Sequence, residues 1–390
     1  MFSHRLPASF AQNRIAEALA RRRAAGAPIL DLTESNPTAA SLTYPEEAIA
    51  QALADTRALR YEPSACGLNS ARDAVCRYYA DRGLKVPADR LLLTASTSEA
   101  YAYLFKVLCE PDDEVLVPRP SYPLFEFLAN LESVRVVQYP LFYDRGWHLD
   151  LHDLESRVTA RTRAVILVNP NNPTGSYLKR REWVELSALC AARGLAVVSD
   201  EVFSDYTLGD DSGYATVVAA MAGDALCFSL SGLSKIAGLP QLKLGWMATG
   251  GPEKLIAEAL RRLELIADTY LSVGTPVQLA VPSLLKMGQG IRTQIRGRTR
   301  ANLEALRHAV RGSVVSVLEV EGGWYATLQV PRTRSEEEWV LLLLDAHGVL
   351  VQPGFFYDFS SEAFLVFSLL TPPEVFRAGV ARLLDAVAAE

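Results

Sequence analysis

The feature that most constrains the fold is a series of short apolar runs that recur between residues 91 and 248. Each run is rich in Val, Leu and Ile, and longer helix-compatible segments separate several of them. Continuous apolar strands that alternate with helices are typical of a mostly parallel sheet covered by helices on both faces. The pattern predicts seven strands, at residues 91–94, 114–117, 134–139, 163–168, 195–199, 225–230 and 242–248.

The rest of the chain predicts a smaller domain of α+β type. A long helical stretch covers residues 276–310, and short strands and helices are mixed after it. A chain of 390 residues with 49% hydrophobic residues is long and apolar enough to form two packed domains. We therefore expect an α/β fold with a large domain at 41–280 and a small domain formed by 1–40 plus 281–390.

Charge and cysteine usage exclude several classes of function. The net charge is −6 with no long run of one sign, so the chain lacks a nucleic-acid footprint. The five cysteines form no C-x-x-C pair and the five histidines have no metal spacing, so we expect a reduced, cytoplasmic protein without disulfides or a metal site. No apolar run reaches the roughly 18 residues of a membrane span.

The first 23 residues are rich in Arg and poor in acidic residues. Organellar transit peptides share this composition with ordinary amphipathic helices. Phe10, Ile15 and Leu19 fall near helical spacing. We therefore interpret the segment as an N-terminal helix that packs on the rest of the protein.

Residues that follow the predicted strands are candidates for a ligand site, because open α/β sheets bind ligands at the carboxyl ends of their strands. Ser96 and Thr97 follow the first run and begin a helix, where hydroxyls and free N–H groups suit a phosphate. Helix capping, with Glu99 at the capping-box position, explains the same residues. Tyr122 follows the second run between prolines, which hold an aromatic ring that suits either stacking on a flat ligand or core packing.

Two further polar residues follow the central strands. Asn172 lies in Asn-Pro-Asn-Asn-Pro-Thr-Gly after the run at 163–168, where two X-Pro units restrain the backbone at the sheet edge. Asp200 follows the run at 195–199. A carboxylate at the end of a buried strand is costly unless it meets a cation, so Asp200 predicts a positively charged neighbour.

Lys235 ends the turn Ser-Leu-Ser-Gly-Leu-Ser-Lys, and only seven of the 39 basic residues are lysines. Lysine, unlike arginine, can lose its proton and attack a carbonyl, although a solvated loop lysine is the ordinary alternative. A phosphate anchor, an aromatic ring, an amide, a carboxylate and a lysine on one rim are the groups that pyridoxal 5′-phosphate requires. The carboxylate keeps the pyridine nitrogen protonated, and the lysine forms a Schiff base and then carries the proton.

On these residues the chain resembles the class I/II aminotransferases, a family of fold-type I pyridoxal-phosphate-dependent enzymes. The motifs Asn-Pro-Asn-Asn-Pro-Thr-Gly, Ser-Asp-Glu and Ser-Lys occur here in the order of that family. The resemblance makes the domain at 41–280 the cofactor-binding one and implies a homodimer in which Tyr61 reaches the phosphate of the neighbouring subunit. It also implies a substrate-side loop at 354–357.

The resemblance further implies a role for each candidate residue. Lys235 carries the cofactor as an aldimine, Asp200 pairs with the ring nitrogen, Asn172 binds the ring 3′-oxygen, Tyr122 stacks on the ring, and the phosphate is held by Ser96, Thr97 and Ser234.

Three positions around the cofactor depart from the family pattern. Phe203 replaces a tyrosine that usually donates to the 3′-oxygen, and Tyr206 is the nearby candidate to replace it. Loss of that donor should raise the pKa of the aldimine, because its deprotonated form loses a stabilising hydrogen bond. Lys243 replaces an arginine, which keeps the positive charge for the phosphate and loses the bidentate fork. Gly232 replaces a hydroxyl residue, with Ser231 beside it.

The fourth departure concerns the substrate. The family usually holds the substrate α-carboxylate with an arginine in the last strand, and the matching position here is Val366. No arginine occurs from residue 355 to residue 371. Either another arginine binds the carboxylate or the amino donor is unusual, so the sequence leaves the substrate open.

The predicted function is a pyridoxal-phosphate-dependent aminotransferase that exchanges an amino group between an amino donor and a 2-oxo acid at Lys235. The alternative with the same cofactor is a lyase, decarboxylase or cyclase on an amino-acid-like substrate, which the valine at 366 keeps open. A regulator or scaffold without turnover is the third hypothesis. Regulators on this fold usually carry an extra DNA-binding domain, and the net charge of −6 disfavours one here.

Overall fold

The computed structural model describes residues 3–7, 13–209, 213–215 and 223–389. Its centre is an eight-stranded sheet in which six strands run in one direction, while β9 and β5 are antiparallel to their neighbours. In spatial order the strands are β2 (Leu91–Thr94), β9 (Gly245–Gly250), β8 (Cys227–Gly232), β7 (Ala196–Asp200), β6 (Thr162–Val168), β3 (Glu114–Arg119), β4 (Arg135–Tyr143) and β5 (Trp147–Leu149).

The α/β prediction is confirmed, and each of the seven predicted runs becomes a strand of this sheet. The eighth strand, β5, was not predicted. It is three residues long and pairs with the end of β4 through a turn in which Arg145 has a positive φ of 54°. A three-residue strand leaves too short a pattern for periodicity to identify.

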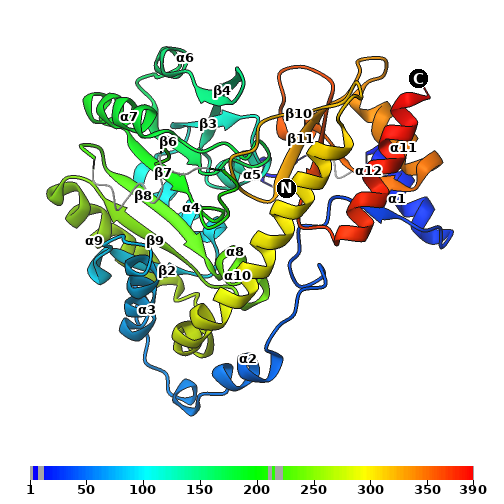
Figure 1. Cartoon of the computed structure of the whole chain (residues 1–390). Helices are drawn as coiled ribbons and strands as arrows, with labels where there is room; N and C mark the ends of the chain where they lie inside the picture. Colours follow the sequence, from blue (N-terminus) through cyan, green and yellow to red (C-terminus); the bar gives the residue numbers. More distant parts are fainter. Residues whose placement is uncertain (1–2, 8–12, 210–212, 216–222, 390) are drawn as a thin grey trace.

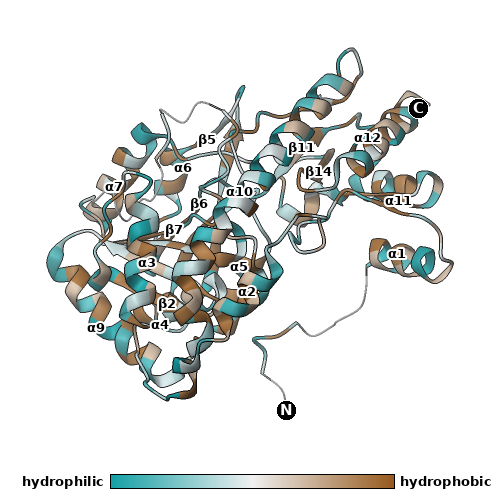
Figure 2. Cartoon of the chain, turned by 60° about the horizontal axis from the view of Figure 1, so that its bottom comes forward, coloured by the Kyte–Doolittle hydropathy of each residue, from teal (hydrophilic) through white to brown (hydrophobic). Residues whose placement is uncertain are grey.

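The apolar runs are continuous because both faces of the sheet are covered. Within β3, Leu116 packs in one core while Val115 and Val117 pack in the other, and Val197 and Val198 of β7 divide in the same way. The first core includes residues of α3 (Asn69–Ala80), α7 (Arg180–Arg193) and the start of α10 (Thr275–Ala309), and the second includes residues of α4 (Thr97–Leu108), α5 (Leu124–Leu131) and α9 (Glu253–Tyr270). The helical ribbons of Figure 2 alternate between teal and brown, as expected for helices with one buried face.

A second, four-stranded antiparallel sheet lies beside the upper part of α10 (Figure 1). Its spatial order is β10 (Ser316–Val317), β11 (Tyr325–Gln329), β14 (Phe364–Ser368) and β13 (Gln352–Pro353). A third core joins this sheet to the neighbouring helices α11 (Glu336–His347) and α12 (Pro373–Ala388) and to α1 (Arg14–Ala24).

The N-terminal segment packs with the core beside this second sheet. Strand β1 (Leu30–Asp31) pairs in parallel with β12 (Val349–Leu350), and Ile15 of α1 and Leu32 are buried in the third core. Phe10, the first residue of the predicted amphipathic pattern, lies outside the described residues.

The segment between β1 and α3 lies against α10, and Ile49 and Leu53 within it pack on the first core. It contains α2 (Glu46–Leu53), which has no buried residue, and the short helix η1 (Thr56–Leu59). In Figure 1 this segment forms an arm below the large sheet. Leu59 and Tyr61 at its end are 88% and 82% exposed, respectively. Large apolar side chains exposed together mark a surface that a partner could cover.

The helices in the described part of the chain include none that is long and apolar enough to cross a bilayer. The same part holds no group of three or more His, Cys, Asp and Glu residues that could bind a metal. All five cysteines are free thiols.

The third core generates a stability prediction. Leu343 of α11 is 0% exposed, so Leu343→Ala should lower the free energy of unfolding by about 2–5 kcal/mol through lost burial and a residual cavity. Val314 is 71% exposed, and Val314→Ala should change the free energy of unfolding by less than about 0.5 kcal/mol. Urea unfolding followed by circular dichroism measures both, and equal effects would contradict this assignment of the core.

Candidate functional site

One cleft gathers the residues that follow the strands of the large sheet. Asp200 ends β7, Asn172 follows β6, and Tyr122 follows β3. Ser96 and Thr97 follow β2, while Ser234 and Lys235 lie in the four-residue helix α8 (Leu233–Ile236) after β8, and Lys243 precedes β9. All eight of these residues line this one cleft, and Tyr61 does not.

Lys235 lines the cleft, and two aromatic rings lie close to its amine. Its Nζ is 5.4 Å from the centre of the Phe203 ring and 4.8 Å from that of the Trp324 ring. Burial lowers the pKa of the Lys235 amine to about 8, and the Asp200 carboxylate opposes this shift. A substantial fraction of this amine is therefore neutral near physiological pH, which is the form that attacks a carbonyl.

Asp200 is the acidic residue of the cleft lining. Burial raises the pKa of its carboxyl to about 6, although a hydrogen bond from the Val202 N–H to Oδ1 (3.2 Å) and the charge of Lys235 act in the opposite direction. The Tyr101 hydroxyl lies 3.5 Å from Oδ2. Asp200 is therefore ionised at neutral pH, and a second cation in the cleft would stabilise it.

The asparagine motif divides into structural and cleft-facing side chains. Asn169 donates to the Ala215 carbonyl (2.6 Å) and accepts from the Leu178 N–H (3.0 Å), and Asn171 donates to the Pro120 carbonyl (2.9 Å). Asn172 lines the cleft, and its buried Oδ1 has no hydrogen-bond partner in the described part of the chain. A ligand in the cleft could satisfy this amide.

Ser96 both caps a helix and lines the cleft. Its Oγ accepts from the Glu99 N–H (3.2 Å) as the N-cap of α4, and Glu99 accepts in turn from the Ala95 N–H (2.7 Å). Thr97 begins the helix with its hydroxyl in the cleft lining. The helix N-terminus, these hydroxyls and the Lys243 ammonium form a site suited to a phosphate.

Two departures from the family pattern have clear structural outcomes. A Cβ on Gly232 would lie 2.9 Å from the Cα of Gly245, so a hydroxyl side chain has no room there. The Tyr206 hydroxyl donates to the Lys235 backbone carbonyl (2.5 Å), and Tyr206 is absent from the residues that line the cleft. Tyr206 therefore does not take the place of the hydroxyl that Phe203 lacks.

Several residues of the cleft were missed by the sequence analysis. Tyr101 lies one turn after Thr97 on α4, a spacing that could have indicated the same helix face. Ser35, Tyr325 and Gln352 come from the N-terminal segment and the second sheet, and no local pattern identifies them. Tyr357, in the predicted substrate-side loop, does line the cleft.

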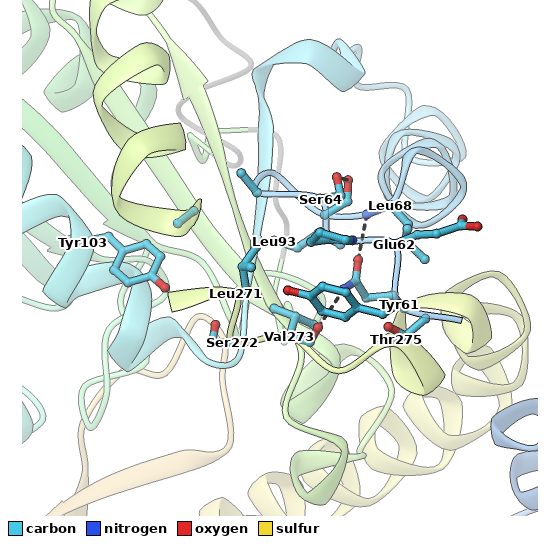
Figure 3. Close-up of a pocket in the computed structure, with 15 residues that line it drawn as sticks. Tyr61, Glu62, Ser64, Leu68, Leu93, Tyr103, Leu271, Ser272, Val273 and Thr275 are labelled. Carbon is cyan, nitrogen blue, oxygen red and sulfur yellow. Dashed lines mark hydrogen bonds between the residues drawn. The ribbon is translucent and has the colours of Figure 1, made fainter. Parts of the chain in front are cut away.

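Tyr61 lies in a different place. It lines a shallow pocket with Glu62, Ser64 and residues near the ends of α9 and α10, including Ser272 (Figure 3). Beside it, the Gln278 side chain accepts from the Leu68 N–H at 2.7 Å, one of the dashed bonds in Figure 3. Tyr61 therefore does not take part in the cleft of its own chain.

Comparison with known proteins relates this chain to one family of enzymes. A family model described as aminotransferase class I and II matches residues 27–383. The glutamate-pyruvate aminotransferase AlaA of Escherichia coli is 30% identical over 267 residues, which are 68% of this chain and 65% of that protein. The alanine aminotransferase of Mycobacterium tuberculosis is 32% identical over 276 residues, 70% of this chain and 63% of that protein. The matched stretch thus spans about two thirds of this chain and slightly less of each relative.

Solved structures of similar fold cover the whole chain. An alanine aminotransferase from Pyrococcus furiosus superposes with a TM-score of 0.89 at 23% identity, covering 100% of both chains. An aminotransferase from Escherichia coli gives a TM-score of 0.87 at 24% identity, covering 100% of this chain and 98% of that chain. At these identities the structures establish the fold.

The geometry around Lys235 generates a pH prediction. Reductive methylation of Lys235 by formaldehyde, measured by peptide mass spectrometry across pH 6–10, should reach half of its maximal rate near pH 8. In Asp200→Asn the midpoint should move to lower pH, because the carboxylate that stabilises the ammonium is gone. A midpoint that stays in place or rises in Asp200→Asn would contradict the coupling of the two groups.

Proposed function

The chain belongs to the class I and II aminotransferase family, and from this premise we propose that it is a pyridoxal-phosphate-dependent aminotransferase. It exchanges an amino group between an amino donor and a 2-oxo acid. The observation that carries the proposal is the buried Lys235 amine, whose pKa is about 8, in one cleft with the Asp200 carboxylate. The cleft is the active site, and Lys235 is its catalytic residue.

The cleft fits pyridoxal phosphate in three respects. The unpaired Asn172 Oδ1, the Asp200 carboxylate and the hydroxyl-rich start of α4 call for a hydrogen-bond donor such as a ring hydroxyl, a cationic nitrogen and a phosphate, respectively. We assign the ring oxygen to Asn172, the ring nitrogen to Asp200, stacking on the ring to Tyr122, and the phosphate to Ser96, Thr97, Ser234 and Lys243. When bound, the cofactor supplies an electron-withdrawing ring that stabilises negative charge on the substrate carbon next to the amine.

The protein contributes a proton carrier and a fixed charge. Because its pKa is about 8, the Lys235 amine can take up and return a proton near neutral pH. Asp200, with a pKa of about 6, stays ionised at that pH and holds a proton on the ring nitrogen by charge attraction. The Phe203 and Trp324 rings beside the amine exclude water from it.

We also propose the two-domain division at 41–280 and 1–40 plus 281–390, with the cleft between the two parts. A homodimer is the second element of this proposal. The exposed Leu59 and Tyr61 at the end of the arm support it, because Tyr61 lies outside its own cleft and is free to reach the phosphate end of a neighbouring one. The cytoplasmic location remains a prediction from the reduced cysteines.

The first functional prediction concerns the lysine. Lys235→Ala should lower the rate of amine exchange by at least about a thousandfold, because it removes the nucleophile and proton carrier. It should also abolish the near-ultraviolet and visible absorption of bound cofactor that survives gel filtration. Lys254→Ala, an exposed change in α9, is the matched control and should retain both properties.

The result separates the alternatives. Retained exchange in Lys235→Ala would overturn the assignment. Release of carbon dioxide or of a carbon fragment without a transferred amine would favour a decarboxylase or lyase over an aminotransferase.

The second prediction concerns the dimer. Tyr61→Ala and Lys235→Ala should each be impaired when pure, and a mixture unfolded and refolded together should regain activity. In a mixed dimer the cleft of the Tyr61→Ala chain keeps its own lysine and receives an intact Tyr61 from the other chain. If Tyr61 served its own cleft, each cleft of the mixed dimer would carry one defect, and no activity would return.

A further inference from the structure

The substrate end of the cleft carries no charged side chain. Among the described residues that line the whole cleft, the cations are Lys235 and Lys243 and the anion is Asp200. Lys235 and Asp200 are committed to the cofactor ring, and Lys243 lies beside the phosphate end, two residues before Gly245. A substrate carboxylate would therefore find no guanidinium in this cleft, and a second substrate amine would find no carboxylate.

The residue at the position of the family's arginine, Val366, is buried behind the cleft lining rather than in it. Val366 of β14 lies directly opposite Thr327 of β11 and Gln352 of β13, so these three side chains share one face of the small sheet. Val366 is 1% exposed and packs in a cluster that includes Phe203 and Tyr357. A carboxylate in the cleft would therefore receive no compensating charge from this position.

The polar groups at this end are neutral hydrogen-bonding groups. The Tyr357 hydroxyl donates to the Gln352 Oε1, which leaves the Gln352 amide N–H groups for a ligand. Tyr325 and Ser35 form a second hydrogen-bonded pair in the lining, and burial raises the pKa of Tyr325 to about 12, so its hydroxyl stays protonated. Hydroxyls and an amide recognise hydroxyl and carbonyl oxygens without requiring a counter-charge.

We propose that the preferred substrate of this cleft is a primary amine whose amine-bearing carbon is flanked by an uncharged hydroxyl or carbonyl group, as in an amino alcohol or amino sugar, and carries no carboxylate. The inference rests on the proposed function. The 2-oxo acid is then the weaker of the two substrates, because its carboxylate meets only uncharged donors. In the first half-reaction the C–N bond of the donor is replaced by C=O and one water is consumed. In the second, the C=O bond of the acceptor is replaced by C–N and one water is released. The two changes balance, so no oxidant is needed.

Two matched pairs test this without any mutation. Protein loaded with pyridoxal phosphate is mixed with alaninol or with alanine. Protein loaded with pyridoxamine phosphate is mixed with hydroxyacetone or with pyruvate. The absorbance change of the cofactor follows each half-reaction. Within each pair the compounds differ only in CH₂OH against carboxylate. The efficiency for the neutral compound should exceed that for the acid by at least about tenfold.

The outcomes distinguish the two proposals. Equal or better efficiency for alanine and pyruvate would overturn the substrate inference and leave the aminotransferase proposal standing. Carboxylate binding by Arg60 of a second copy would give that result, and Arg60→Ala would then abolish the preference for the acids. No response to any amine would overturn the proposed function and the inference with it.

Val366→Arg supplies a readout that does not depend on turnover. The new guanidinium should raise the melting temperature in the presence of propanoate, whereas wild type should show no such shift, and the preference for alaninol over alanine should fall by about tenfold or more. A propanoate shift of equal size in wild type would contradict the inference. If Val366→Arg does not fold, the matched substrate pairs on wild type decide the question alone.

Discussion

The structure depends on the placement of an amine and a carboxylate, Lys235 and Asp200, in one largely water-excluded cleft. Each carries a charge that burial disfavours, and each partly compensates the other. Two adjacent parallel strands, β7 and β8, bring them together because their carboxyl ends lie side by side. The opposed pKa shifts, to about 6 for the acid and about 8 for the base, keep a carboxylate and an available amine together near neutral pH.

The large sheet supplies only one side of this environment. The rings that cover Lys235 include Trp324, which precedes β11 of the small sheet, and the Ser121 N–H beside Tyr122 donates to the Tyr357 carbonyl at 3.0 Å. The small sheet is in turn joined to the N-terminus through the β1–β12 pair and to the large sheet through α10, which packs against both α3 and α12. The low dielectric around the lysine is thus a property of the whole chain.

This division explains which parts of the site could be predicted from sequence. Each residue at a strand end, such as Asp200 or Asn172, carries a local signal, because an apolar run stops and a polar residue follows. Gln352 and Ser35 carry none, since their place in the cleft arises from pairing between segments more than 300 residues apart in sequence, at β1 and β12. The family resemblance gave Tyr61 a role beyond its own chain, and its position outside the cleft agrees with that role without testing it.

The same division bears on how far family membership fixes the chemistry. The phosphate end of the cleft is built from strand-end residues of the large sheet, where Lys243 keeps the positive charge of the family's arginine and Gly232 leaves no room for a hydroxyl side chain. At the other end Gln352 of the small sheet lines the cleft, and Thr327 and Val366 on the same face of that sheet are neutral. A fold shared with alanine aminotransferases therefore constrains the cofactor more strongly than the substrate. The residue opposite Gln352 in this sheet is a buried valine, so this position offers no charge that could stabilise a carboxylate.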